Sequence, residues 1–304
     1  MDDAAIYLML KTGPRGSPAE TTRPIATIAG LTKRFGRKVA LESVDVAIHP
    51  GEVVGLVGRN GAGKSTLIAI ASGLMRPSAG TVTVEGRIAL LPERVAFVEH
   101  LTGMANLRLL GRLRAKPNDD QLQDLLERVG LQPDLRTSVA KYSLGMRQRL
   151  GVAQALMEEA DFVVLDEPAN GLDPEGIRWL RDVVRAEAAR GAGVLISSHL
   201  LTELERSCDR VLVLDGGRMV DSWRPTEDGE SGLITVRVSV RRKLEEGCAA
   251  AGWPVRERAD GSFLITVDSA TGEVVRRLAN AGVDFEEVRP ARASIEDVLF
   301  GSDE

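Results

Sequence analysis

The 304-residue sequence predicts an α/β fold for most of the chain and a smaller α+β domain at its C-terminal end. Apolar runs of buried-strand length occur at 53–57, 162–165 and 194–197, and segments with helical periodicity separate them. A glycine-rich loop joins the first run to a short helix. A polar stretch with proline and glycine at 224–232 precedes a run of alternating apolar and polar residues, which indicates a domain boundary.

The glycine-rich loop carries the most specific motif. It matches the pattern G-x-x-x-x-G-K-[ST] with the residues Gly58, Arg59, Asn60, Gly61, Ala62, Gly63, Lys64, Ser65 and Thr66. A strand before the loop and a helix after it place backbone N–H groups around an anion. The pattern predicts that a nucleoside triphosphate binds, with Lys64 reaching the β- and γ-phosphates and Ser65 ligating Mg²⁺. The alternative is an ordinary glycine-rich turn that enters a helix.

A second motif ends the apolar run at 162–165, where Asp166 and Glu167 follow directly. A buried strand of a parallel sheet would bring both carboxylates to the nucleotide crevice at its carboxyl end. We expect Asp166 to belong to the Mg²⁺ shell and Glu167 to act as the general base on the attacking water. Alone, the pattern also fits a buried strand followed by an acidic turn, but the upstream loop favours the nucleotide site.

A third motif, the run 142–149, precedes Asp166 by about two dozen residues. Ser143 is a good N-cap for the periodic segment 144–157, and the helix start would form an anion site. In the variant form S-L-G-M-[KR]-Q-R-L, the motif resembles the signature sequence of ATP-binding cassette (ABC) ATPases. The resemblance implies that Ser143 and Gly145 contact ATP, whereas local chemistry alone also fits a capped helix without a ligand.

Further residues continue the resemblance to the ABC family in the family's order. The run 170–173 stands in the place of the D-loop, and Asp173 followed by Pro174 is typical of a helix start. His199 occupies the place of the switch histidine, which contacts the γ-phosphate, and Phe35 that of the aromatic residue that stacks on adenine. Without the resemblance, His199 would be structural or solvent-facing and Phe35 a core aromatic.

Two departures from the common family pattern point to one branch of it. Glu93 follows the short apolar run 88–91, where most members carry the glutamine of the Q-loop. A carboxylate there can still reach Mg²⁺ or its water, since Mg²⁺ prefers oxygen ligands. In the signature, Leu144 precedes Gly145 and Met146 follows it. Both departures resemble the antibiotic-export and resistance branch of bacterial ABC transporters, which implies export of an antibiotic or another amphipathic compound.

The resemblance covers about residues 25–222 and implies a P-loop NTPase fold with a helical subdomain at about 97–158. In the family, the phosphate loop of one domain faces the signature of another, and two ATP molecules lie in a head-to-tail dimer. This chain has one motif of each kind, so a second copy or a paralogue would complete the site. We expect the ABC nucleotide-binding domain at 24–223, a linker at 224–232 and an accessory domain at 233–304.

The composition restricts the partners. The net charge of −5 and the pI near 5.5 give no support for a nucleic-acid-binding surface. Cys208 and Cys248 lie far apart without metal spacing, which fits reduced thiols. We expect residues 1–23 to form a flexible, dispensable extension. The acidic Asp2 and Asp3 precede its apolar stretch, whereas a signal peptide begins with positive charge.

No segment approaches the length of a membrane span. If the chain drives transport, an integral-membrane permease encoded separately must supply the pore, and we expect a cytoplasmic protein at the inner face of the cell membrane. In the family, the helical segments between the Q-loop and the signature receive a coupling helix of the permease.

The C-terminal residues predict a domain with the order β-α-β-β-α-β, which is the ferredoxin-like arrangement. Alternation at 234–240, a helical stretch at 242–251 and a turn at Asp260-Gly261 support this order, and a final helix is expected at 295–300. The domain could aid dimerisation, bind a partner or sense a ligand, or it could be a structural appendage.

The prediction is therefore an ATP-hydrolysing subunit of a bacterial ABC exporter that uses ATP and Mg²⁺. The alternative is a soluble ABC ATPase acting on ribosomes or DNA, although the chain has neither two cassettes nor an inserted coiled coil. A regulatory GTPase would need an N-K-x-D-like motif, which the sequence lacks. An importer, or a lipid or osmolyte system, is a further alternative within transport.

Overall fold

The computed structural model describes residues 23–112, 117–132, 136–199, 204, 206–223, 233–258, 260–267 and 271–290. These residues fall into two compact units, one within 23–223 and the other within 233–290. Residues 1–22 of the expected N-terminal extension, the expected linker and the expected final helix lie outside the described residues. Among the residues described, none of the helices combines the length and the apolar character needed to cross a bilayer.

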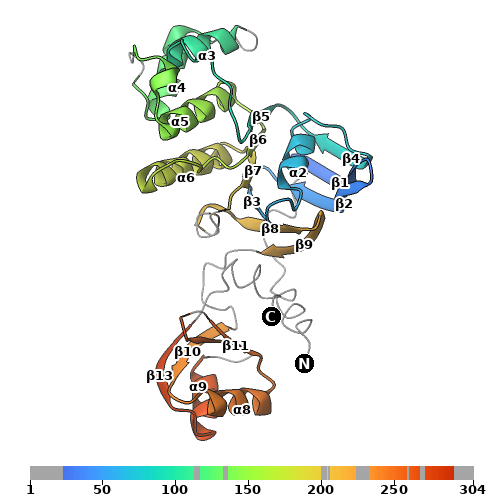
Figure 1. The fold of residues 1–304 in the computed structure, drawn as a ribbon, viewed down its shortest axis with the longest axis vertical. Helices are drawn as coiled ribbons and strands as arrows, with labels where there is room; N and C mark the ends of the chain where they lie inside the picture. The colour runs from blue at the N-terminus through green and yellow to red at the C-terminus, as the bar shows by residue number, and fades with distance from the viewer. Residues whose placement is uncertain are drawn as a thin grey trace. The chain divides into compact units, whose positions relative to one another are not determined.

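A six-stranded sheet in the order β5-β6-β7-β3-β8-β9 forms the centre of the first unit (Figure 1). Its first five strands are parallel and β9 is antiparallel to β8. The strands are β3 (Val53–Val57), β5 (Ile88–Leu91), β6 (Phe162–Leu165), β7 (Gly193–Ser197), β8 (Arg210–Asp215) and β9 (Arg218–Trp223). Every residue of β3, β6 and β7 is buried, as expected for parallel strands covered on both faces.

The parallel strands end at one edge of this sheet, and the predicted site residues follow those ends. The phosphate loop begins after β3, and Glu93 comes two residues after β5. Asp166 follows β6 directly, and His199 comes two residues after β7. Because β3, β6 and β7 are adjacent, segments far apart in the chain meet at this edge. The α/β fold predicted from the apolar runs is confirmed.

A second, three-stranded antiparallel sheet in the order β2-β1-β4 was not predicted from the sequence. It consists of β1 (Ala26–Phe35), β2 (Lys38–Ile48) and β4 (Ala79–Val84). The helix α2 (Lys64–Ala71) packs into one core with its strands and with β3 and β6 (Figure 1). A tight turn joins β1 to β2, with Phe35 opposite Lys38, and Gly36 adopts φ 57° in that turn. This turn places Phe35 and Lys38 together at the end of the hairpin.

Three helices follow β5 and lie together beside the sheet (Figure 1). They are α3 (Gly103–Gly111), α4 (Asp119–Arg128) and α5 (Leu144–Ala155), with a short 3₁₀ turn η2 (Val139–Lys141) before α5. Thr102 caps α3, Asn118 caps α4 in a capping box, and Ser143 caps α5. The cap predicted at Ser143 is confirmed, but α5 ends two residues earlier than the predicted Met157.

The helix α6 (Pro174–Ala189) links β6 to β7. The Asp173 side chain accepts a hydrogen bond from the Gly176 N–H at 2.7 Å, and Pro174 occupies the first helical position. Gly191, with φ 103°, follows the end of the helix. The start and the glycine stop that the sequence predicted are both confirmed.

The second unit has its own buried core, built from one face of a four-stranded antiparallel sheet and two helices. Its elements follow one another as β10 (Leu233–Val238), α8 (Arg241–Ala251), β11 (Val255–Glu257), β12 (Phe263–Thr266), α9 (Thr271–Asn280) and β13 (Phe285–Pro290). This is the predicted β-α-β-β-α-β order, and the strands are arranged as β11-β12-β10-β13.

Candidate functional site

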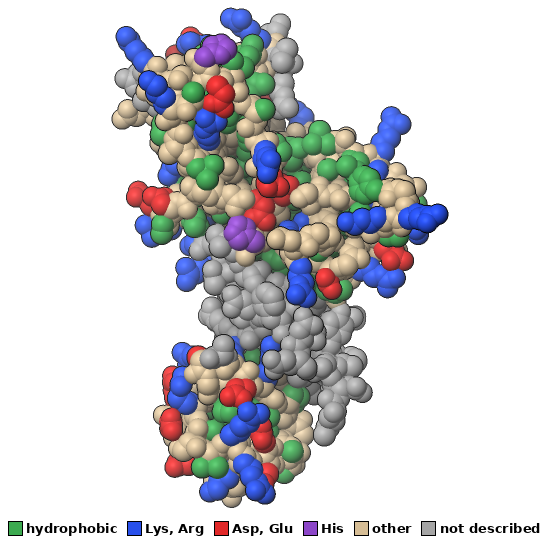
Figure 2. All heavy atoms as spheres, viewed as in Figure 1, with side chains coloured by type: hydrophobic (Ala, Val, Ile, Leu, Met, Phe, Trp, Pro, Cys, Tyr) green, Lys and Arg blue, Asp and Glu red, His purple; other side chains and the backbone are tan. Residues whose placement is uncertain are grey.

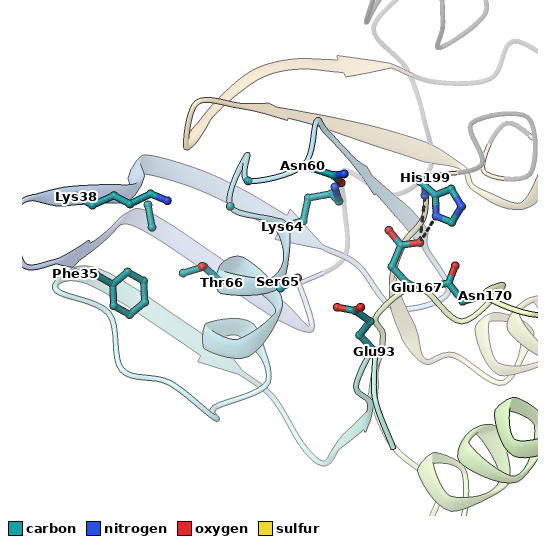
Figure 3. Close-up of a pocket in the computed structure, with 13 residues that line it drawn as sticks. Phe35, Lys38, Asn60, Lys64, Ser65, Thr66, Glu93, Glu167, Asn170 and His199 are labelled. Carbon is teal, nitrogen blue, oxygen red and sulfur yellow. Dashed lines mark hydrogen bonds and ion pairs between the residues drawn. The ribbon is translucent and has the colours of Figure 1, made fainter. Parts of the chain in front are cut away.

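A cavity of about 610 Å³ opens at the carboxyl edge of the central sheet (Figure 3). Its size is that of a small-molecule site. The residues that line it come from the β1–β2 hairpin, the phosphate loop with α2, and the segments after β5, β6 and β7; they are Phe35, Lys38, Ala40, Asn60, Gly61, Gly63, Lys64, Ser65, Thr66, Glu93, Glu167, Asn170 and His199. Most of the residues predicted for the site therefore surround one space.

The phosphate loop has the conformation that its glycines permit. Gly61 and Gly63 have φ 85° and 111°, a region that favours glycine. A Cβ on Gly58 would lie 2.2 Å from the Leu214 carbonyl oxygen, and one on Gly63 would lie 2.6 Å from that of Ala40. Neither position accepts a side chain without a shift of the backbone.

Lys64 lies inside the curve of the loop. Its Nζ donates a hydrogen bond to the Gly58 carbonyl oxygen at 2.6 Å. Gly58 itself, Arg59 and Ala62 shape the loop but are not among the residues that line the cavity. The helix α2 begins at Lys64 without a side-chain cap, because the residue before it is Gly63. The N–H groups of its first turn, near Ser65 and Thr66, are arranged as an anion site.

Asp166 is buried directly behind the cavity, with 6% of its surface exposed. The Ser197 hydroxyl donates to Asp166 Oδ1 at 2.7 Å and accepts a hydrogen bond from the Glu167 N–H at 2.8 Å. Burial raises the pKa of Asp166, and the carboxylates of Glu167 and Glu93 add to the rise, while Ser197 and Lys64 oppose it. Negative charge is therefore concentrated beside the phosphate loop.

Glu167 and His199 form a pair on the cavity wall (Figure 3). His199 Nδ1 lies 2.7 Å from Glu167 Oε2, and the backbone N–H of His199 donates to the same oxygen at 3.3 Å. Glu167 adopts the left-handed φ of 50°, which is uncommon for a residue with a side chain. Its side chain is 14% exposed and that of His199 59% exposed. His199 is thus exposed, as the alternative interpretation held, but it is also bonded to the carboxylate that follows β6.

Phe35 is not a core residue, because 48% of its surface is exposed and its ring lines the cavity. The Lys33 ammonium lies 5.1 Å from the ring centroid. Lys38, opposite Phe35 in the hairpin, adds a positive charge to the wall. Sequence reasoning missed Lys38, because only the pairing of β1 with β2 brings it to the cavity. It also missed Ser197, although a serine that ends an apolar strand was a visible signal.

Ser143 and Gly145 do not line the cavity. The Ser143 hydroxyl accepts a hydrogen bond from the Met146 N–H at 3.2 Å, and Ser143 is exposed at the start of α5. Leu144 is 62% exposed and packs against Gly171, at which a Cβ would lie 2.2 Å from a Leu144 methyl group. The start of α5 therefore adjoins the run 170–173 but contributes no residue to the lining of the cavity.

The comparisons with known proteins agree on the family. The family model for ABC transporters matches residues 41–170. The chain is 34% identical to the uncharacterized ABC transporter ATP-binding protein YdbJ of Bacillus subtilis, over 90% of this chain and 94% of that protein. It is 35% identical to the daunorubicin resistance ATP-binding protein DrrA3 of Streptomyces coeruleorubidus, over the same shares of the two chains.

A solved structure of an ATP-binding subunit of an ABC transporter is similar, with a TM-score of 0.62 and 27% identity, over 84% of this chain and 99% of the other. The chain is more than 30% identical to both relatives over 90% of its length. Its cavity has the phosphate loop on one side and the Glu167–His199 pair on the other. The chain thus belongs to the ABC transporter family and is an ATP-binding subunit whose cassette hydrolyses ATP.

Proposed function

We propose that this ATPase drives the export of an antibiotic or another amphipathic compound through a separate membrane permease. The observation that supports the chemistry best is the Glu167–His199 pair, held at 2.7 Å across the cavity from the phosphate loop. The relative DrrA3 is named for daunorubicin resistance, and this supports the assignment of the cargo class. Glu93 and the variant signature support the same branch.

The phosphate loop would hold the ATP phosphates with its backbone N–H groups, and Lys64 would leave the Gly58 carbonyl to reach the β- and γ-phosphates. Phe35 would stack on adenine with its exposed ring face. Asn60 and Thr66 line the same wall and would contact the phosphate chain.

Mg²⁺ fits the oxygen donors present. Burial raises the pKa of Asp166, and the nearby carboxylates of Glu167 and Glu93 add to that rise. A divalent cation near the Ser65 hydroxyl would offset this concentration of negative charge. Ser65, Glu93 and Asp166 would hold it, and bound Mg²⁺ would neutralise charge on the phosphates. No group of three or more His, Cys, Asp or Glu side chains in the described parts of the chain has a metal-ligand arrangement.

Glu167 would act as the general base. Its carboxylate lines the cavity and would accept a proton from the water that attacks the γ-phosphate. His199 holds one carboxylate oxygen through its ring and its backbone N–H, so it orients the base, and its ring would contact the γ-phosphate. Ser197 holds the Glu167 N–H and thereby the left-handed turn that aims the side chain.

A second copy of the chain or a paralogue would complete the site. Ser143 and Gly145 lie on an exposed helix start outside the cavity, so the ATP that they would contact must be bound to another subunit. Each ATP would then lie between the phosphate loop of one subunit and the signature of its partner. Hydrolysis would separate the two subunits and move the permease.

The domain boundaries proposed are a nucleotide-binding domain at 24–223 with its helical subdomain at about 97–158, a linker at 224–232 and an accessory domain at 233–304. The strand order β11-β12-β10-β13 supports a ferredoxin-like fold for the accessory domain. The helical subdomain would dock on the permease at the cytoplasmic face of the membrane. On the face seen in Figure 2, basic side chains are scattered among acidic and apolar ones.

The chemistry is tested by Glu167→Gln, which keeps the shape of the side chain and removes the base. We expect unchanged ATP binding and a loss of about 100-fold or more in phosphate release. Glu85→Gln is the control, since Glu85 is 45% exposed in a surface pair with Arg23. Parental turnover in the Glu167 variant would refute the assignment of the base.

The transport role is tested by isolating the tagged full chain from gently solubilised membranes of the native host. Recovery of a polytopic membrane protein in stoichiometric amount would support the exporter, and its cavity could then be tested with candidate cargo. Recovery with ribosomes or DNA-processing proteins, without a membrane partner, would instead favour a soluble ABC ATPase.

A further inference from the structure

The segment 92–102 leads from the cavity to the start of α3 and contacts α5 on its way. Glu93, near its beginning, lines the cavity. Val95 packs closely on α5, because a Cβ on Gly151 would lie 3.0 Å from a Val95 methyl group. The segment therefore lies along α5 as it leaves the cavity.

The middle of this segment is held by one buried side chain. Asn106, 2% exposed, accepts a hydrogen bond from the Val98 N–H at 2.8 Å. Its amide donates to the carbonyl oxygens of Val98 and Thr102 at 3.1 and 3.0 Å. These three bonds give the segment a defined path, so that a shift of Glu93 is not absorbed by a loose loop.

The far end of the segment is bonded to the residues just before the signature. The Ala140 N–H donates to the Glu99 carbonyl oxygen at 2.9 Å, and the Val139 N–H donates to that of Leu101 at 2.8 Å. The Arg147 guanidinium donates to both carboxylate oxygens of Glu99, at 2.6 and 2.7 Å. Arg147 itself makes an early backbone bond of α5, with its N–H donating to the Ser143 carbonyl oxygen at 3.0 Å.

We propose that Glu99 and Arg147 are positioning residues that fix the signature helix to the segment bearing Glu93, so that Ser143 and Gly145 present their donors to the ATP of the partner subunit. The proposal rests on the proposed function, because it assumes that Ser143 and Gly145 act on a second subunit's ATP. A bidentate carboxylate–guanidinium pair suits this role, since it defines an orientation as well as a distance.

Exposure of the pair argues against a role limited to stability. The side chains of Glu99 and Arg147 are 53% and 30% exposed, and such pairs contribute little to folding. The same helical cluster contains a matched pair, in which Arg108 donates to both oxygens of Asp119 at 2.8 Å. That pair joins α3 to α4 and does not involve α5, so it separates the effect of an ion pair as such from an effect on the signature.

The experiment measures phosphate release and the binding of a fluorescent ATP analogue by the purified full chain. Glu99→Gln is expected to lower kcat about tenfold without changing the Kd for nucleotide, because only the partner's contacts are displaced. Arg147→Lys keeps the positive charge but cannot donate two parallel hydrogen bonds to the Glu99 carboxylate. We therefore expect a kcat between those of the parent and of Glu99→Gln. The exchanged double variant E99R/R147E should recover most of kcat, and Asp119→Asn should leave kcat and Kd unchanged.

Parental turnover in both single variants, or a loss no greater than that of Asp119→Asn, would overturn the proposal. A changed nucleotide Kd, or an exchanged variant that melts like its parent without recovering kcat, would also overturn it. If Glu99→Gln does not fold, Arg147→Lys is judged by the same criteria. Ser143→Arg distinguishes failure of the proposed function from failure of the positioning role. Parental turnover in Ser143→Arg would refute the contact of Ser143 with the partner's ATP. An inactive Ser143→Arg together with an unaffected Glu99→Gln would refute only the positioning role of Glu99 and Arg147.

Discussion

Ser197→Ala tests the hydrogen-bond network behind the cavity. Ser197 is fully buried, and its hydroxyl serves two groups at once. It donates to the buried carboxylate of Asp166 and accepts from the Glu167 N–H. Removing the hydroxyl leaves both groups without this partner, and no polar atom of alanine replaces it.

The magnitude follows from those two bonds. A hydrogen bond to a charged group contributes about 1.5–3 kcal/mol, and an orphaned buried donor costs about 1–3 kcal/mol. Because partial relaxation recovers some of the loss, we expect the free energy of unfolding of the first unit to fall by about 2–4 kcal/mol. Turnover should fall about tenfold or more, since the left-handed turn that aims Glu167 loses its support.

The assay is urea unfolding followed by tryptophan fluorescence in a Trp253→Phe background. The chain has three tryptophans, so this background leaves only Trp179 and Trp223, both in the first unit. Ser72→Ala is the control, because the Ser72 hydroxyl makes a single long bond to the Ala69 carbonyl oxygen at 3.3 Å. Phosphate release by the same proteins gives the effect on kcat.

If Ser197→Ala loses no more stability than Ser72→Ala and keeps the parental kcat, the two hydrogen bonds of Ser197 support neither the fold nor the position of Glu167. A loss of stability with unchanged kcat would refute the part that assigns the orientation of Glu167 to Ser197. An unchanged stability with reduced kcat would instead show that water replaces the hydroxyl without restoring the turn.

Two further substitutions test the loop and the hairpin. Gly58→Ala should destabilise the first unit by about 1–3 kcal/mol and weaken ATP binding, because its Cβ would lie 2.2 Å from the Leu214 carbonyl oxygen. Gly272→Ala, where a Cβ meets no atom within 4 Å, is the control, and equal unfolding midpoints would contradict the clash. Phe35→Ala should raise the Kd for ATP about fivefold through the loss of about 1 kcal/mol of stacking, measured by titration calorimetry. Leu74→Ala, at an exposed residue outside the cavity wall, should leave the Kd unchanged, and an equal Kd in both variants would exclude stacking.

Much of the fold could be predicted because its signals are local. The strands at 53–57 and 162–165 and the caps at Ser143 and Asp173 depend on runs of a few residues, and the structure has them as predicted. The sheet of β1, β2 and β4 was missed. Its strand β4 pairs with β1 from far along the chain, and such a pairing leaves no local pattern.

The candidate site divides in the same way. The phosphate loop, Asp166 and Glu167 could be predicted from residue type and from their position after an apolar run. His199 was assigned only from its place in the family's order of motifs. Phe35 could be assigned to the cavity only by resemblance, and Lys38 not at all, because both reach it through the β1–β2 hairpin.

The type of chemistry could be predicted from short runs of sequence, because phosphate binding and proton transfer require particular residue types at short spacings. How those residues are combined depends on folding, which brings distant segments of the chain into contact. The 2.7 Å contact of His199 with Glu167 and the bonds of Ser197 exist because the parallel strands β6 and β7 lie side by side. The pairing of Glu99 with Arg147 likewise arises only from folding, since contacts across long stretches of chain depend on packing rather than on local preference.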